Sequence, residues 1–104
     1  MVDVGDKPIT QREAIARGLI TMSRRALTAI RRRAVAKGDP LQAARLAGIM
    51  APKQTSTLIP LSHPLPLTHV SVELAAMSKG YSIEARVRTS AQTGVEMEAL
   101  VAVA

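Results

Sequence analysis

Apolar and polar residues alternate along two neighbouring stretches in the second half of the chain. Every second position in these stretches is apolar, namely Val70, Val72 and Leu74, then Tyr81, Ile83, Ala85 and Val87. A period of two is typical of β-strands with one buried and one wetter face. Because Ser78-Lys79-Gly80 separates the two stretches, the pattern predicts a β-hairpin.

The first third of the chain combines a predicted strand with a predicted helix. Residues 12–22, REAIARGLITM, are rich in short apolar residues with imperfect alternation, which favours a strand. Ser23 can then cap a helix. Its apolar stripe would consist of Leu27, Ile30 and Ala34, at positions i, i+3 and i+7. We expect Gly38 to end this helix.

Two further helices are indicated by the residues at their starts. Asp39 and Pro40 place an N-cap carboxylate and a first-turn proline ahead of residues 41–50, LQAARLAGIM. We expect Pro52 to close that helix. Near the C-terminus, Thr93-Gly94-Val95-Glu96 matches a capping box and predicts a helix over residues 95–104.

The predicted order of elements is strand, helix, helix, strand, strand, helix. This order indicates an α+β fold with helices packed on an antiparallel sheet. No repeat or linker divides the 104 residues, so we expect one domain over residues 1–104. A domain of this size buries only about 60–70% of the surface of its unfolded chain, which favours support from partner subunits. The last predicted helix has no stop signal before Ala104, so we expect the domain to be incomplete at its C-terminus.

The composition excludes several kinds of chemistry and location. The chain has no cysteine, which rules out disulfides, thiolate zinc ligands and thiol catalysis. Residues 1–10, MVDVGDKPIT, do not resemble a signal peptide, and no run of about 18 apolar residues could span a membrane. We therefore expect a soluble, cytoplasmic protein with no membrane partner.

The positive net charge favours anionic partners. Fourteen Lys and Arg against eight Asp and Glu give a formal charge of +6. Five arginines fall on the first predicted helix, at positions 24, 25, 31, 32 and 33. They could contact duplex phosphates, or they could simply form a solvated helix face. Single-stranded nucleic acid is disfavoured because the only aromatic residue is Tyr81.

His63 is the first candidate for catalysis. Pro64 follows it and restricts its backbone to extended conformations, so the imidazole would be held in a stiff loop. It could act as a general acid or base, or donate to a phosphate when protonated. The alternative is a histidine that only caps a backbone group in a turn. The other histidine, His69, is predicted to lie on the surface at the start of a strand.

Two lysines and two glutamates are further candidates. Lys37 and Lys53 each follow a predicted helix, where an ammonium could offset the helix dipole or reach a phosphate. Glu96 and Glu98 are two residues apart, which on a helix points their side chains about 200° apart. Glu96 has a role as the capping-box glutamate. A buried Glu98 would require a partner or a substrate.

These residues lie in blocks that resemble one protein family. The runs AARLAGIMAPKQTSTLIPLSHPLPLTHVSVEL and ARVRTSAQTGVEMEALVAV look like the molybdenum cofactor biosynthesis protein C (MoaC) family. The resemblance covers nearly the whole chain and includes the blocks KGD, LIPL-x-HPL and TGVEMEAL. It implies a cyclic pyranopterin monophosphate synthase, which converts 3′,8-cyclo-7,8-dihydroguanosine triphosphate into cyclic pyranopterin monophosphate and pyrophosphate. It also implies a ferredoxin-like fold, a hexamer built as a trimer of dimers with the pocket at a subunit interface, and no metal or redox cofactor.

The resemblance also implies roles for individual residues. Lys37 matches a catalytic lysine, and Leu61, Ser62 and His63 match a substrate-contacting segment around the family histidine. A second such segment is matched by Met97 and Glu98, with Glu96 beside them. We expect the cations, Lys53 among them, and His63 to hold the triphosphate and help pyrophosphate leave. The carboxylates would bind guanine N–H groups and move protons.

The sequence departs from the family pattern in two places. Ser62 stands where members often carry cysteine, so a thiol is not needed there. The family continues beyond the last residue here through an Asp-x-x-Lys stretch and a Gly-Gly-Lys-Ser-Gly tail. A chain that lacked them would assemble but have little turnover. The alternatives are therefore an inactive assembly or nucleotide-binding fragment of the family, or a basic nucleic-acid-binding module.

Overall fold

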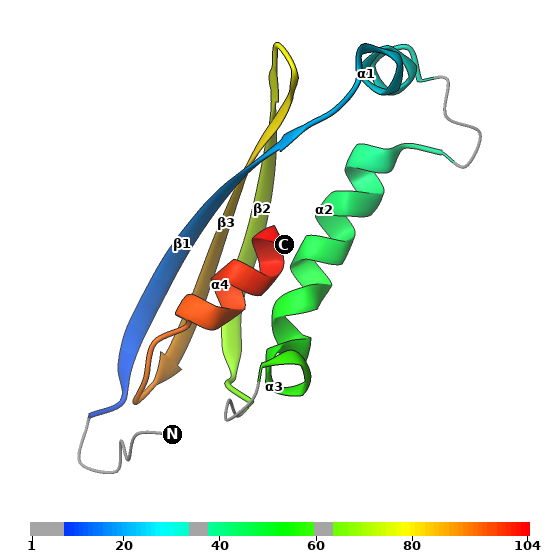
Figure 1. Cartoon of the computed structure of the whole chain (residues 1–104). Coiled ribbons are helices and arrows are strands. Elements are labelled where there is room, and N and C mark those ends of the chain that lie inside the picture. The colour runs from blue at the N-terminus through cyan, green and yellow to red at the C-terminus, as the bar shows by residue number, and fades with distance from the viewer. Residues whose placement is uncertain (1–7, 34–37, 60–63) are drawn as a thin grey trace.

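A twisted three-stranded antiparallel sheet forms the centre of the molecule, as Figure 1 shows. The computed structural model describes residues 8–33, 38–59 and 64–104. The sheet order is β1-β3-β2, with β1 at Thr10–Thr21, β2 at Leu67–Met77 and β3 at Gly80–Ala91. The predicted first strand and the predicted hairpin are confirmed.

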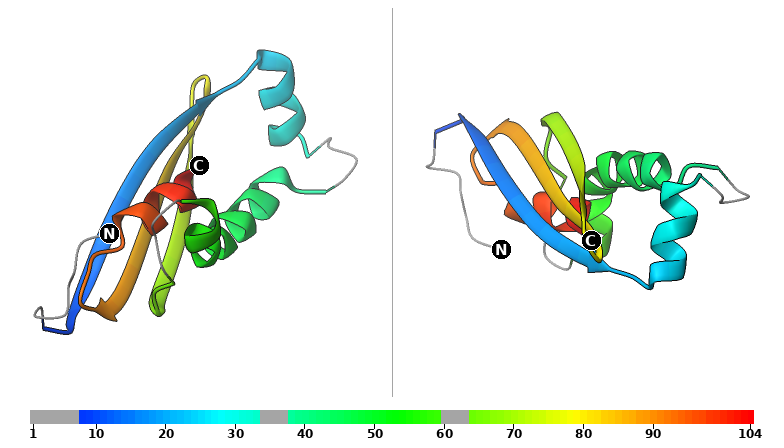
Figure 2. Two further views of the ribbon diagram at one scale, coloured as in Figure 1. Left: turned by 60° about the horizontal axis from the view of Figure 1, so that its bottom comes forward. Right: turned by 90° about the horizontal axis from the view of Figure 1, so that it is seen from above.

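Helices cover one face of this sheet. Helix α2 (Pro40–Met50) lies along β2, and α4 (Glu96–Val103) crosses β1 and β3 (Figure 2). The buried residues between these layers are mainly small or β-branched, namely Ala16, Val72, Ala85, Val87, Val95, Ala99 and Ala102. The architecture is α+β with helices on an antiparallel sheet, as predicted, and is consistent with a ferredoxin-like fold.

Small residues let α2 approach the sheet closely. Gly48 is buried, and a Cβ added there would lie 3.0 Å from Cγ2 of Val72 and 3.2 Å from the carbonyl oxygen of Ala102. The helix starts as predicted, since the Asp39 carboxylate accepts from the N–H of Leu41 at 3.0 Å. Beyond Met50 the chain continues as a 3₁₀ turn, η1 (Ala51–Gln54), and a short helix, α3 (Thr55–Leu58), which the pattern did not predict.

Helix α1 (Arg24–Arg31) lies at one end of the sheet, away from the helical layer (Figure 2). Its predicted cap is confirmed, because Ser23 Oγ accepts from the N–H of Ala26 at 3.1 Å. The prediction that Gly38 ends it is wrong. Arg33 adopts a left-handed conformation (φ 54°), and its N–H donates to the carbonyl of Ile30 at 3.1 Å, so the helix ends several residues earlier. Ala34 lies outside the described residues.

The start of α4 differs from the prediction. A capping box requires its glutamate at the third helical position, with the capping threonine three residues before it. The helix instead begins at Glu96, its N-cap is Val95, and no side chain caps it. The Glu96 carboxylate lies over Gly94, where an added Cβ would be 2.4 Å from Oε1.

Candidate functional site

A cavity of about 260 Å³ lies where η1, α3, the start of β2 and the first turn of α4 converge. This site cavity is the one lined by Pro52, Lys53, Thr55, Ser56, Pro64, Leu65, Leu67 and Glu98. Figure 1 shows that α3 and the start of β2, which carry part of this lining, lie at the same end of the molecule. It therefore combines one acid, one cation and two hydroxyls in otherwise apolar walls.

Glu98 is the most deeply buried acid of the described residues, with 4% of its surface exposed. It lies in the first turn of α4, where backbone N–H groups and the helix dipole favour a negative charge. A carboxylate in such surroundings can accept hydrogen bonds from a bound N–H donor or exchange a proton with it. Glu98 is thus placed to serve both binding and proton transfer.

Two buried threonines hold the walls of the site cavity. The Thr55 hydroxyl is 1% exposed and donates to the carbonyl of Pro52 at 2.8 Å, which fixes the turn that carries Lys53. The Thr89 hydroxyl, on the central strand, donates to the carbonyl of Pro66 and fixes the opposite wall. Hydrogen bonds of this kind orient a site without contacting its ligand.

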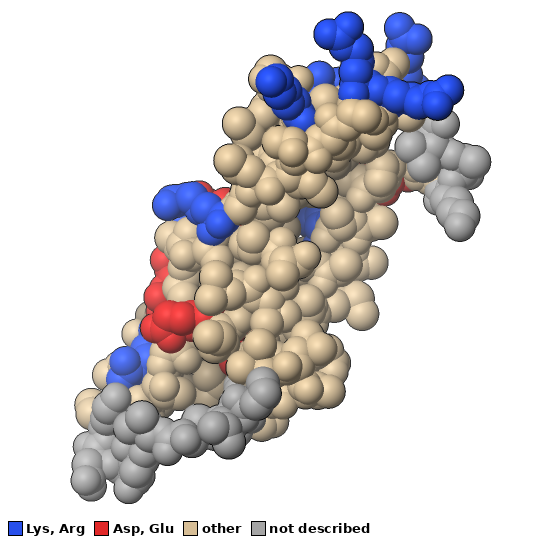
Figure 3. All heavy atoms as spheres, in the orientation of Figure 1, with Lys and Arg blue, Asp and Glu red and all other residues tan. Residues whose placement is uncertain are grey.

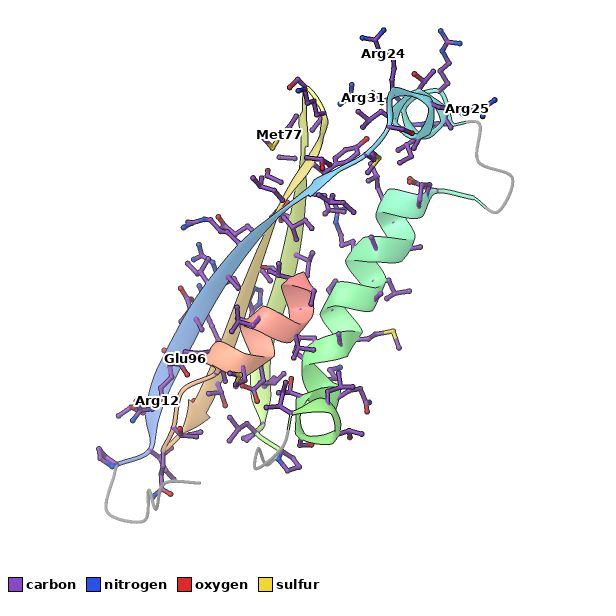
Figure 4. The ribbon with its side chains drawn as sticks, in the orientation of Figure 1. Arg12, Arg24, Arg25, Arg31, Met77 and Glu96 are labelled. Atoms are coloured by element: carbon purple, nitrogen blue, oxygen red, sulfur yellow. The ribbon has the colours of Figure 1, made fainter. Side chains whose placement is uncertain are left out.

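The structure brings together only some of the predicted site residues. Lys53 and Glu98 line the same cavity. Met97 is 44% exposed, Glu96 is exposed, and neither lines the cavity. The opposite orientation of Glu96 and Glu98 agrees with their predicted separation around the helix. Figure 4 shows Glu96 at the start of α4, on the side toward β1.

Lys37, Leu61, Ser62 and His63 lie outside the described residues. Their neighbours in the chain are informative. Pro64, which follows His63, lines the site cavity. Gly38, which follows Lys37, precedes the start of α2, whereas the cavity lies beyond the other end of that helix. An α2 of 11 residues is about 16 Å long at 1.5 Å per residue, so these two neighbours are far apart within one chain.

The contributions of Thr55, Ser56 and Thr89 were not predicted from the sequence. Threonine and serine are common in turns and strands, so no local pattern distinguishes a hydroxyl that fixes a cavity wall. The only hint in the sequence is that both threonines donate to the carbonyl of a proline, Pro52 or Pro66. Proline is common in turns, and a turn is often stabilised by a side-chain hydrogen bond.

Charges on the other face of the sheet are paired with each other. Arg17 Nε lies 2.9 Å from Oε2 of Glu84, and Arg86 lies within 3.4 Å of Glu13 and 3.8 Å of Glu84. Arg88 also donates to Glu13, and this hydrogen bond holds the pKa of the Glu13 carboxyl below its usual value. All of these paired charges on this paired-charge face are more exposed to solvent than Glu98.

The fold and the site cavity indicate a class of protein, and comparison with known proteins identifies the family. An α+β domain whose cavity combines a buried carboxylate with a lysine is suited to a small polar ligand. The MoaC family model matches residues 1–104. Relatives named cyclic pyranopterin monophosphate synthase include those of Dinoroseobacter shibae (57% identity over 105 residues) and Cereibacter sphaeroides (54% over 105 residues). The chain belongs to the MoaC family, which confirms the resemblance.

The aligned region is nearly complete in this chain but not in the relatives. The match covers 99% of this chain and 66% of the Dinoroseobacter and Cereibacter proteins. For a Thermomicrobium roseum relative of the same name, 54% identical over 106 residues, the values are 100% and 64%. The chain therefore spans about two thirds of the length of the relatives that it matches.

Proposed function

We propose that this protein acts in molybdenum cofactor biosynthesis as a cyclic pyranopterin monophosphate synthase. The substrate is 3′,8-cyclo-7,8-dihydroguanosine triphosphate, and the products are cyclic pyranopterin monophosphate and pyrophosphate, so the enzyme is a lyase. Family membership supports the activity. The single structural observation that carries the proposal is the buried Glu98 in a cavity shared with Lys53.

In this proposal, some residues act on the phosphates of the substrate and others act on its base. The Lys53 ammonium neutralises the triphosphate, and Lys37 and His63 assist the departure of pyrophosphate as the cyclic phosphate forms. Leu61 and Ser62 contact the substrate beside His63. Glu98 accepts hydrogen bonds from the N–H groups of the guanine-derived ring and moves protons during its rearrangement.

The site is completed by a second copy of the chain. Gly38 and the site cavity lie at opposite ends of α2, which favours contact of the Lys37 segment with the cavity of a neighbouring copy. Glu96 and Met97, which do not line the cavity of their own chain, would contact substrate from such an interface. A hexamer built as a trimer of dimers, working in the cytoplasm, satisfies this requirement. Among the described residues, no helix is long and apolar enough to cross a membrane.

The proposal is tested by release of pyrophosphate from the cyclised guanosine triphosphate. Glu98→Gln removes the charge of the buried carboxylate at almost constant volume, and we expect at least about a hundredfold loss of turnover. Glu73→Gln is the matched control, because Glu73 is an exposed carboxylate on β2, and it should keep full activity. Equal activity of the Glu98→Gln variant and the unmodified protein would remove Glu98 from the mechanism.

A further inference from the structure

A second hollow lies at the opposite end of the molecule from the site cavity. It has a volume of about 540 Å³ and separates α1 from the turn between β2 and β3. This basic hollow is lined by Met22, Arg24, Leu27, Thr28, Arg31, Ser78 and Lys79. Volumes of 300–1,000 Å³ are usual for small-ligand sites.

The basic hollow carries cations without acids. Three of its lining residues are cationic, namely Arg24, Arg31 and Lys79, and none is acidic. Within the described residues the ion pairs lie on the outer face of the sheet and involve none of these three. Figure 3 shows Lys and Arg gathered around α1, whereas most of the visible acids lie beside β1 and the start of α4. The cations of the hollow are therefore available to an external anion.

Hydrogen bonds fix both walls of the basic hollow. The N–H of Met22 donates to the carbonyl of Lys79 at 2.9 Å, just before α1 begins. At the other end of the helix, Arg31 Nη2 donates to the carbonyl of Met77 at 2.6 Å, and Figure 4 shows both residues. A guanidinium has five N–H donors, so Arg31 keeps others for a ligand. Leu27 is buried and forms an apolar floor.

The position of the arginines on α1 is electrostatically unfavourable in the absence of an anion. Arg24 and Arg25 lie in the first turn of the helix, which contains no acid. Cations in a first turn oppose the helix dipole. A bound anion reverses this effect, because it is attracted both by the helix end and by the side chains.

We propose that the basic hollow binds a small molecule through its di- or triphosphate chain. Arg24, Arg31 and Lys79 neutralise the phosphates, and the hydroxyls of Thr28 and Ser78 donate to phosphate oxygens. Leu27 and Met22 limit the depth of entry. This binding site is separate from the cavity of Glu98 and does not depend on the proposed enzyme activity.

Calorimetric titration of the chain with inorganic tripolyphosphate at low ionic strength tests the proposal. We expect two classes of site, one at Lys53 in the site cavity and one per chain at the basic hollow. The affinity of the hollow should fall about tenfold or more in the Arg24→Gln/Lys79→Gln double variant, because hydrogen bonds between charged groups are strong. Arg17→Gln/Arg86→Gln is the matched control. It removes the same charge from the outer face of the sheet and should keep the affinity.

Further arms of the titration separate this site from its alternatives. Lys53→Gln should leave tripolyphosphate binding at the hollow unchanged, and loss of that binding would place the ligand in the site cavity instead. Equal weakening in both double variants would show attraction to net charge alone. Tighter binding of duplex DNA through Arg24 and Lys79 would replace the small ligand by nucleic acid. Each of these three results overturns the proposal, whereas activity toward the cyclised nucleotide is measured separately.

Discussion

The two ends of the sheet hold their charges in different ways. At the site cavity, Glu98 is almost completely buried, and buried threonine hydroxyls fix the walls around it. At the basic hollow, Arg24 and Arg31 are exposed on α1, which stands apart from the helical layer, and Lys79 is exposed in the turn between β2 and β3. A charge in a low-dielectric site acts strongly on a bound group, whereas exposed charges are screened within about 8–10 Å at physiological salt. The cavity end is therefore suited to chemistry, and the α1 end to salt-sensitive binding.

Complementation between two inactive variants gives the largest effect and tests whether the cavity end is complete in one chain. Lys37→Ala and Glu98→Gln should each lose at least about a hundredfold in turnover. When the two are mixed and allowed to exchange subunits, mixed dimers contain one intact site, so about a quarter of the activity should return. Pyrophosphate release before and after mixing measures it.

The control for complementation pairs two residues of the same cavity. Lys53→Ala and Glu98→Gln both damage the cavity of their own chain, so mixing them should restore nothing. Recovery in this control, or none with Lys37→Ala, would contradict a site shared in the proposed way.

Removing the Thr55 hydroxyl should weaken the cavity end by a smaller amount. Thr55→Val keeps the shape of the side chain but removes one of two donors to the carbonyl of Pro52, which also accepts from the backbone N–H of Thr55, so we expect a cost of about 0.5–1.5 kcal/mol. Thr55→Ser keeps the donor and should lose less. Urea denaturation followed by circular dichroism measures both free energies of unfolding.

The same substitution at the α1 end sharpens the comparison. Thr28→Val changes a half-buried threonine on the basic hollow, and we expect a change within about 0.5 kcal/mol. If Thr28→Val and Thr55→Val destabilise the protein equally, the cavity walls are not specially held.

The two strands of the hairpin were predictable from the sequence because apolar and polar residues alternate along them. Val72, Ala85 and Val87 are buried in the core, as their period of two indicated. The end of α1 and the start of α4 were predicted wrongly. Gly38 was expected to end α1, but Arg33 adopts the left-handed conformation that is usual for glycine and the helix ends before it. The capping-box motif of Thr93 and Glu96 is not formed, because α4 begins only at Glu96.

Two residues that line the site cavity, Lys53 and Glu98, were also predicted from the sequence. Glu98 was singled out because a carboxylate in an apolar helix needs a partner, and it is buried in the site cavity. Lys53 lies in the same cavity as Glu98, and Gly38 lies far from both, because of the way α2 and η1 pack against β2 and α4. Such long-range contacts have no signature in local periodicity.

The smallest expected effect concerns the paired charges on the outer face, between the two ends. Glu13 accepts from Arg88 and also pairs with Arg86, and these contacts lower its pKa from the ordinary value of 4.5. A lowered folded-state pKa stabilises the fold above pH 4.5, and the contribution is lost as the pH falls through the folded-state value. The stability difference between the unmodified protein and Glu13→Gln should therefore be largest near neutral pH and vanish in acid.

Two controls complete this test: the same measurement at high salt, and the same substitution at another exposed glutamate. Because the Glu13 pairs are exposed to solvent, added salt should reduce the difference at neutral pH, as expected for screened charges. Glu73→Gln, at an exposed carboxylate with no ion pair among the described residues, should show no such salt dependence. If the stability difference between the unmodified protein and Glu13→Gln persisted at high salt, the Glu13 ion pairs would not be screened by solvent. The proposed contrast with the buried charge of the site cavity would then be wrong.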